Sequence, residues 1–142
     1  VIATLLGGGA ISVLACGGLL VALAMESGES SPQEAREWFK TVVNADPSSF
    51  TDIQHYTDQG IDFSHHFRFV FADIDELRPI IEYHGLTEAP NTLPMHMDHL
   101  PDWYDPFNVP ADALRYGCDG YEPILLIVDP DAKIAYFEMV HL

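Results

Sequence analysis

Basic residues are scarce in this sequence. The 142 residues include 6 lysines and arginines against 22 aspartates and glutamates, which gives a formal net charge of −16 at pH 7. A protein of that charge repels the phosphates of DNA and RNA, so the composition excludes a nucleic-acid-binding protein. The lack of basic clusters also removes any electrostatic attraction to anionic lipid headgroups.

Cysteine is almost as rare. The chain contains only Cys16 and Cys118, which excludes a disulfide-rich scaffold. The acidic neighbour Asp119 disfavours the reactive thiolate, so Cys118 is interpreted as a free, partly buried residue. The sequence shows no glycine-rich phosphate loop and no local nucleophile signature, so we expect a protein that is not an enzyme and holds no cofactor. A dispersed serine–histidine–acid centre stays open, because its members need not be close in sequence.

Charge is absent from residues 1–25, which are almost wholly apolar. At ~1.5 Å per residue a helix of this length reaches about 37 Å, enough to cross a ~30 Å hydrocarbon core. The segment therefore predicts a single transmembrane α-helix. A cleaved signal peptide, or a lipoprotein signal in which Val13–Gly17 resembles a lipobox, is the alternative.

Small residues follow one line of the expected helix at intervals of four: Thr4, Gly8, Ser12 and Cys16. Such spacing favours close packing against other transmembrane helices, although glycine and alanine are also simply common in apolar helices. No histidine lies in residues 1–25, so this helix offers no histidine ligand to haem or chlorophyll.

The residues after Met25 are acidic, beginning with Glu26 and Glu29. Cytoplasmic flanks of membrane helices are usually rich in lysine and arginine. We therefore expect a single-pass protein of the bacterial inner membrane, with a cytoplasmic N-terminus and a periplasmic domain.

The remainder predicts a linker at 26–31 and a small α+β domain at 32–142, with an antiparallel sheet of four or five strands and two helices on one face. A capping box at Ser31–Glu34 opens the first helix, which should end near Asn44. Asp73 or Asp75 caps the second helix, which should end at Gly85.

Strands are expected at 50–57, 62–72, 122–128 and 133–140. In the second of these, phenylalanines alternate with polar residues, so the face with Phe67 should be core and the face with His66 and Arg68 should face solvent. Ile124–Val128 is apolar on both faces, which is typical of a central strand.

A long proline-rich loop occupies residues 86–112. Such loops usually bind something or are packed by their own aromatic residues. Trp103, Tyr104 and Phe107 are therefore candidates for a protein interface, with a lid over the domain's own sheet as the alternative.

Residues 95–99 read Met-His-Met-Asp-His. His96, Asp98 and His99 could ligate zinc or copper, but a metal site needs a fixed set of three or four ligands, so surface histidines are the simpler interpretation. Aspartates in the same loop could hold calcium, but no EF-hand-like order of ligands is present.

These features favour a non-catalytic accessory subunit of a multi-subunit bacterial membrane complex, photosynthetic or respiratory. Its partners would be other transmembrane helices and a basic protein that docks on the acidic domain. The alternatives are a membrane-tethered metal-binding module using Met95–His99 and an extracytoplasmic enzyme with a dispersed site.

Overall fold

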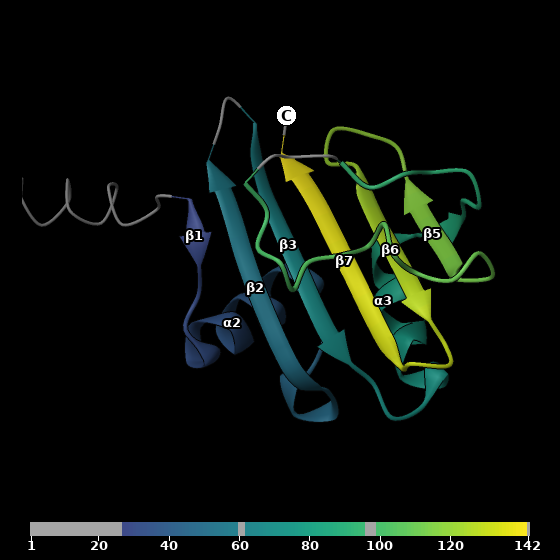
Figure 1. Ribbon diagram of the computed structural model, residues 1–142, viewed down its shortest axis with the longest axis horizontal. Helices are drawn as coiled ribbons and strands as arrows, with labels where there is room; N and C mark the ends of the chain where they lie inside the picture. Colours follow the sequence, from purple (N-terminus) through teal and green to yellow (C-terminus); the bar gives the residue numbers. More distant parts are fainter. Residues whose placement is uncertain (1–26, 60–61, 96–98, 142) are drawn as a thin grey trace, which may run out of the picture.

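The computed structural model describes residues 27–59, 62–95 and 99–141. Its centre is one antiparallel sheet of seven strands in the order β1-β2-β3-β7-β6-β5-β4 (Figure 1). The strands are β1 (Gly28–Glu29), β2 (Thr51–Gln59), β3 (Phe63–Val70), β4 (Thr87–Glu88), β5 (Leu114–Cys118), β6 (Ile124–Asp129) and β7 (Ile134–His141). The sheet is closed at each edge by a strand of only two residues, so the long strands occupy its middle.

The expected fold class is wrong. The sheet has seven strands instead of four or five, and among residues 27–59, 62–95 and 99–141 there is no helix long and apolar enough to span a membrane. The longest apolar run in the described chain, β6, is a strand buried on both faces. A high content of apolar residues does not by itself specify a long helix, and the membrane-spanning assignment is corrected accordingly. The segment expected to form the helix, with Thr4, Gly8, Ser12 and Cys16, lies outside the described residues.

The helices begin where local sequence signals place them. Helix α2 (Pro32–Trp38) opens on the expected capping box and continues as a single π-helical turn, η1 (Phe39–Val43), to a left-handed Asn44. A short 3₁₀ turn, η2 (Pro47–Ser49), leads into β2.

The second helical segment also follows its signals. Asp73 caps the 3₁₀ turn η3 (Ile74–Leu77), which runs into α3 (Arg78–His84). Gly85 ends α3 with φ of 62°, a left-handed conformation that favours glycine. Both expected helices are thus confirmed.

Both helical segments lie behind the sheet in Figure 1, and an irregular segment crosses in front of it. We call the two sides the helix face and the loop face, and the irregular segment, residues 89–95 and 99–113, the cover loop. The helix face holds the main core, in which Phe39 from η1 meets Phe69 of β3 at 4.9 Å between ring centroids. The loop face has a second apolar cluster built from Tyr104, Leu125, Ile127 and Tyr136.

Because both faces are covered, the central strands are buried on both sides. Residues Ile124 to Val128 are all buried, which confirms the interpretation of this strand as central. The expected pairing of β2 with β3 is also confirmed, with His55 opposite Phe67.

Candidate functional site

A cluster of buried polar side chains lies on the loop face, beneath the cover loop. His66 of β3 and Glu138 of β7 are directly opposite each other in the sheet, and Tyr104 of the cover loop packs over them. Their exposed fractions are 0%, 6% and 5%. The expectation that His66 faces solvent is therefore wrong, because the cover loop closes the face that the alternating pattern assigned to water.

Glu138 accepts most of the hydrogen bonds in this cluster. Its Oε1 accepts the backbone N–H of Met95 at 3.1 Å, and its Oε2 accepts the hydroxyl of Tyr104 at 3.4 Å. Burial, together with the nearby charge of Glu138, raises the pKa of Tyr104 well above its ordinary value, so the phenol stays a neutral donor. The cover loop is thereby attached to β7 through one carboxylate.

Only one of the two ring nitrogens of His66 has a hydrogen-bond partner among the described residues. Its Nε2 lies 2.9 Å from the hydroxyl of Ser64, and its Nδ1 lies 3.5 Å from Oε2 of Glu138. Within the described part of the chain this Nδ1 has no hydrogen-bond partner. A fully buried polar atom in that situation is uncommon and marks the cluster as more than ordinary core.

Ser64, His66 and Glu138 resemble the order of groups in a hydrolase triad. A nucleophile must reach its substrate, however, and Ser64 is 1% exposed and buried beneath the cover loop. The serine and histidine also sit two residues apart on one strand, so both side chains are held under the cover loop. This arrangement supports a structural polar network.

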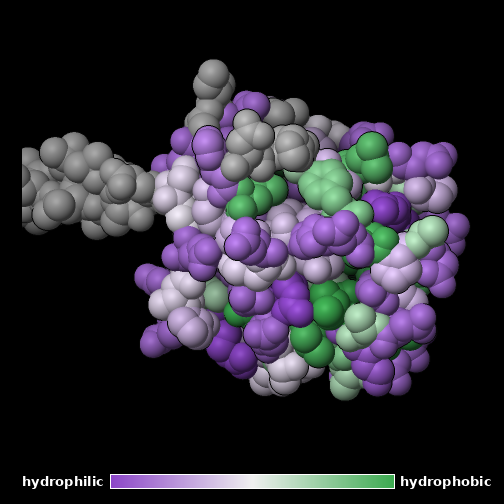
Figure 2. Space-filling view, in the orientation of Figure 1, coloured by the Kyte–Doolittle hydropathy of each residue, from purple (hydrophilic) through white to green (hydrophobic). Residues whose placement is uncertain are grey.

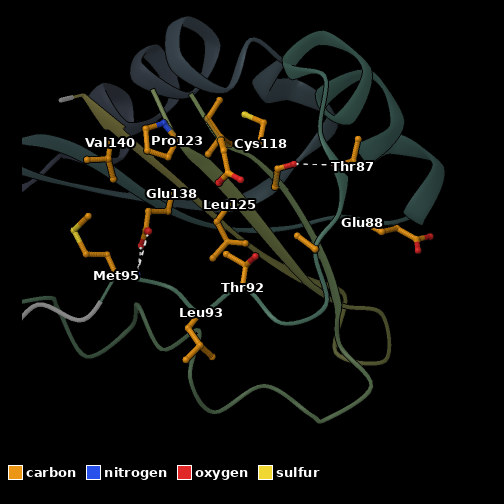
Figure 3. Close-up of a pocket in the computed structure, with 14 residues that line it drawn as sticks. Thr87, Glu88, Thr92, Leu93, Met95, Cys118, Pro123, Leu125, Glu138 and Val140 are labelled. Atoms are coloured by element: carbon orange, nitrogen blue, oxygen red, sulfur yellow. Dashed lines mark hydrogen bonds between the residues drawn. The ribbon is translucent and has the colours of Figure 1, made fainter. Parts of the chain in front are cut away.

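A groove opens beside this cluster, between residues 87–95 and the ends of β5, β6 and β7. Its volume is about 450 Å³, and Glu138 lies in it together with Leu125 and Val140 of the sheet and Leu93 and Met95 of the loop. Figure 3 shows the carboxylate of Glu138 in the middle of these side chains.

The charges of the groove all have one sign. Its acidic members are Glu88, Asp119 and Glu138, and none of the described lining residues is lysine, arginine or histidine. Glu88 points away from the other labelled side chains in Figure 3, whereas Glu138 lies among them. The nearby Arg115 donates to the backbone carbonyl of Thr92 at 3.2 Å and does not line the groove.

The wall of the groove depends on a glycine. A Cβ at Gly117 would lie 3.3 Å from the carbonyl oxygen of Ile124 and 3.4 Å from the Cβ of Ala89. Thr87 pairs with Gly117 across the short β4–β5 ladder. The absence of a side chain at Gly117 therefore lets the start of the cover loop lie close to the sheet.

A second set of buried histidines lies on the helix face. His55 Nε2 is 2.9 Å from His65 Nδ1, and the other nitrogen of His55 is 2.7 Å from the hydroxyl of Ser30. Burial lowers the pKa of His55 to about 3 and that of His65 to about 4. Both imidazoles are thus neutral near pH 7, and Trp38 packs against each of them.

The predicted metal ligands are only partly covered by the structure. His96 and Asp98 lie outside the described residues, and His99 is exposed. In the described chain no group of three or more histidine, cysteine or acidic side chains is arranged to hold a metal ion. Cys118 is half-buried, as expected, and packs against the core of the helix face.

The three predicted interface residues are placed differently from one another. Tyr104 is buried in the loop-face cluster, Trp103 is half-buried against it, and Phe107 is 46% exposed. Tyr104 packs on the domain's own sheet, as expected if this part of the loop is a lid over the sheet.

Sequence reasoning missed Ser64, His66 and Glu138 as members of one site. The signal was present for Glu138, which is the single charge among the apolar residues of β7. A charge within a buried strand indicates a polar partner from elsewhere in the fold.

In comparisons with known proteins, the chain matches no family model, no curated protein and no solved structure.

Proposed function

We propose that this domain is a non-catalytic binding subunit that docks on a basic protein partner. The observation that carries the proposal is the uncompensated negative charge of the molecule, −16 at pH 7. An acidic surface attracts a basic one over a distance of about a Debye length, ~8 Å at physiological ionic strength.

Most of the few basic side chains already bond within the domain. Five of the six are engaged within the domain, on carboxylates or on backbone carbonyls: Arg36, Arg68, Arg78, Arg115 and Lys133. The acidic residues of the cover loop, such as Asp102 and Asp112, are exposed.

We place this docking on the loop face. Figure 2 shows hydrophilic side chains around smaller apolar areas on this face. A protein interface typically combines an apolar centre with a polar rim, so this pattern supports docking of a partner here.

Salt-dependent capture of the partner tests the proposal. The tagged full chain, bound to beads in a lysate of its own cells, should retain a basic protein at about 50 mM salt and release it by about 500 mM. Replacing Asp102 and Asp112 by asparagine should weaken the capture.

The matched control replaces two exposed acids of the helical segments, Glu37→Gln and Glu82→Gln, and removes the same charge from the other side of the sheet. Equal loss in both double variants would mean that net charge alone drives capture. Retention that is insensitive to salt would contradict electrostatic docking.

A further inference from the structure

We propose that the groove beside Glu138 receives a long cationic side chain, lysine or arginine, from the basic partner, with Glu138 as its counter-ion. This inference rests on the proposed function and assigns the residue that anchors it. It differs from attraction by the surface as a whole, because it needs one carboxylate and one cavity.

The first argument is the incomplete compensation of Glu138. Its side chain is 8% exposed, and the Met95 N–H and the Tyr104 hydroxyl, which donate hydrogen bonds to it, are both neutral. A nearly buried carboxylate is costly unless a cation or several good hydrogen bonds accompany it.

The second argument is the position of His66. Its Nδ1 lies 3.5 Å from Oε2 of Glu138, beyond the usual range of a charge-assisted hydrogen bond, which is about 2.7–2.9 Å. The histidine therefore faces the carboxylate without forming a tight ion pair with it. A cation that enters from the groove would complete the coordination of Glu138.

The third argument is the shape and lining of the groove. The approach to Glu138 is lined by Leu93, Met95 and Val140, and its volume is about 450 Å³. Lysine and arginine carry long aliphatic stems that pack on apolar surface while the charged end reaches a polar partner. The groove matches both parts of such a side chain, and its described lining residues include no lysine, arginine or histidine that would repel it.

Binding of n-butylguanidinium and n-butylammonium to the ¹⁵N-labelled full chain tests this assignment. The amide of Met95 donates to Glu138, and Gly117 lines the same groove, so both amide signals should shift on titration. The uncharged n-pentanol, of similar length, should bind at least tenfold more weakly.

The variant Glu138→Gln should weaken binding of both cations at least tenfold. Glu122→Gln is the matched control, because Glu122 is an acid that bonds to His141 and does not line this groove. Thr92→Trp covers the case in which Glu138→Gln fails to fold. The Thr92 side chain is exposed and lines the groove, so tryptophan there should block binding while Glu138 is retained.

Equal binding of n-pentanol would show that Glu138 is not a charged counter-ion and would overturn the assignment. Unchanged binding in Glu138→Gln or in Thr92→Trp would do the same. If the cations fail to bind while salt-dependent capture of a partner persists, the groove assignment falls and the docking proposal stands. If capture is absent while the groove binds the cations, the docking proposal falls and the partner is lost as the source of the cation, although Glu138 remains a cation site.

Discussion

At the scale of the residue, buried polar side chains distinguish this domain from a simple apolar core. Ser30 provides a clear case, because its hydroxyl lies 2.7 Å from Nδ1 of the buried His55 and its N–H donates to the His55 carbonyl. Ser30→Ala removes the partner of Nδ1, so the free energy of unfolding should fall by about 1–3 kcal/mol.

Urea unfolding measures this change. Ser49→Ala is the control, because Ser49 is exposed and its replacement should change stability by less than about 0.5 kcal/mol. Equal stability of the two variants would show that the contact between Ser30 and His55 contributes nothing.

A second prediction contrasts two neighbours on the loop face of β3. His66 is fully buried, whereas Arg68 bonds to the exposed Asp52 near the surface. His66→Ala should destabilise the domain by about 2–4 kcal/mol, because it leaves a cavity and deprives Ser64 of its partner.

Arg68→Gln breaks the ion pair with the exposed Asp52 and the hydrogen bond to Gln54, and it should cost less than His66→Ala, about 0.5–1.5 kcal/mol. Thermal or urea unfolding of both variants decides the comparison. A larger loss for Arg68→Gln than for His66→Ala would contradict the burial described for this strand.

The sequence predicted some residues well and others not at all. Ser31, Asp73 and Gly85 act as caps through bonds to near neighbours, so their roles are visible in a short stretch of sequence. The single charge in an apolar strand marked Glu138, but its partners and the burial of His66 depend on a loop about 35 residues from either, which no local pattern could show.

At the scale of the element, the phenylalanines of β3 join the sheet to η1. Phe67 is fully buried, and its ring meets those of Phe39 and Phe137 edge-on at 5.8 and 6.2 Å between centroids. Phe67→Ala should therefore cost about 3–5 kcal/mol, a large share of the stability of a small domain.

Denaturant unfolding of Phe67→Ala checks this value. Tyr83→Ala is a suitable control, because Tyr83 is 65% exposed on α3. A loss below about 1 kcal/mol for Phe67→Ala would mean that the core of the helix face is not packed around this ring.

Strands whose own residues show a clear apolar pattern were predicted from the sequence. Strands that form because a neighbouring strand pairs with them were not. The strands near 122–128 and 133–140 are apolar enough to stand out, and β6 and β7 confirm them. β5 was missed because Leu114–Cys118 has no clear alternation, and it is a strand because β6 pairs with it. The two-residue strands β1 and β4 are too short for any pattern to show.

At the scale of the whole molecule, the buried histidines couple stability to pH. The pKa of His55 is about 3 and that of His65 about 4 in the folded domain, below the ~6.5 of an unfolded chain. Between about pH 4 and 6.5 the unfolded chain therefore binds more protons, so the free energy of unfolding falls as the pH is lowered.

The expected loss between pH 7 and pH 5 is about 2–4 kcal/mol for the two histidines together. Urea unfolding at pH 7, 6 and 5 measures it. Stability that is constant over this range would show that the imidazoles are not held neutral in the folded domain.

The domain presents two unlike sides to its surroundings. Helices cover one face of the sheet, and the cover loop, with its exposed acids and the groove at Glu138, covers the other. The proposed partner should therefore bind on the loop face. The bacterial complex and the periplasmic location expected from the sequence stay predictions.

Hydrogen exchange on the captured complex tests this central claim most directly. Binding should slow the exchange of backbone amides in residues 87–95 and 99–112, which include the groove and the acidic part of the cover loop. Amides of α2 and α3, on the opposite face, should exchange as in the free domain. Protection confined to α2 and α3, with the cover loop unchanged, would contradict docking through the loop face.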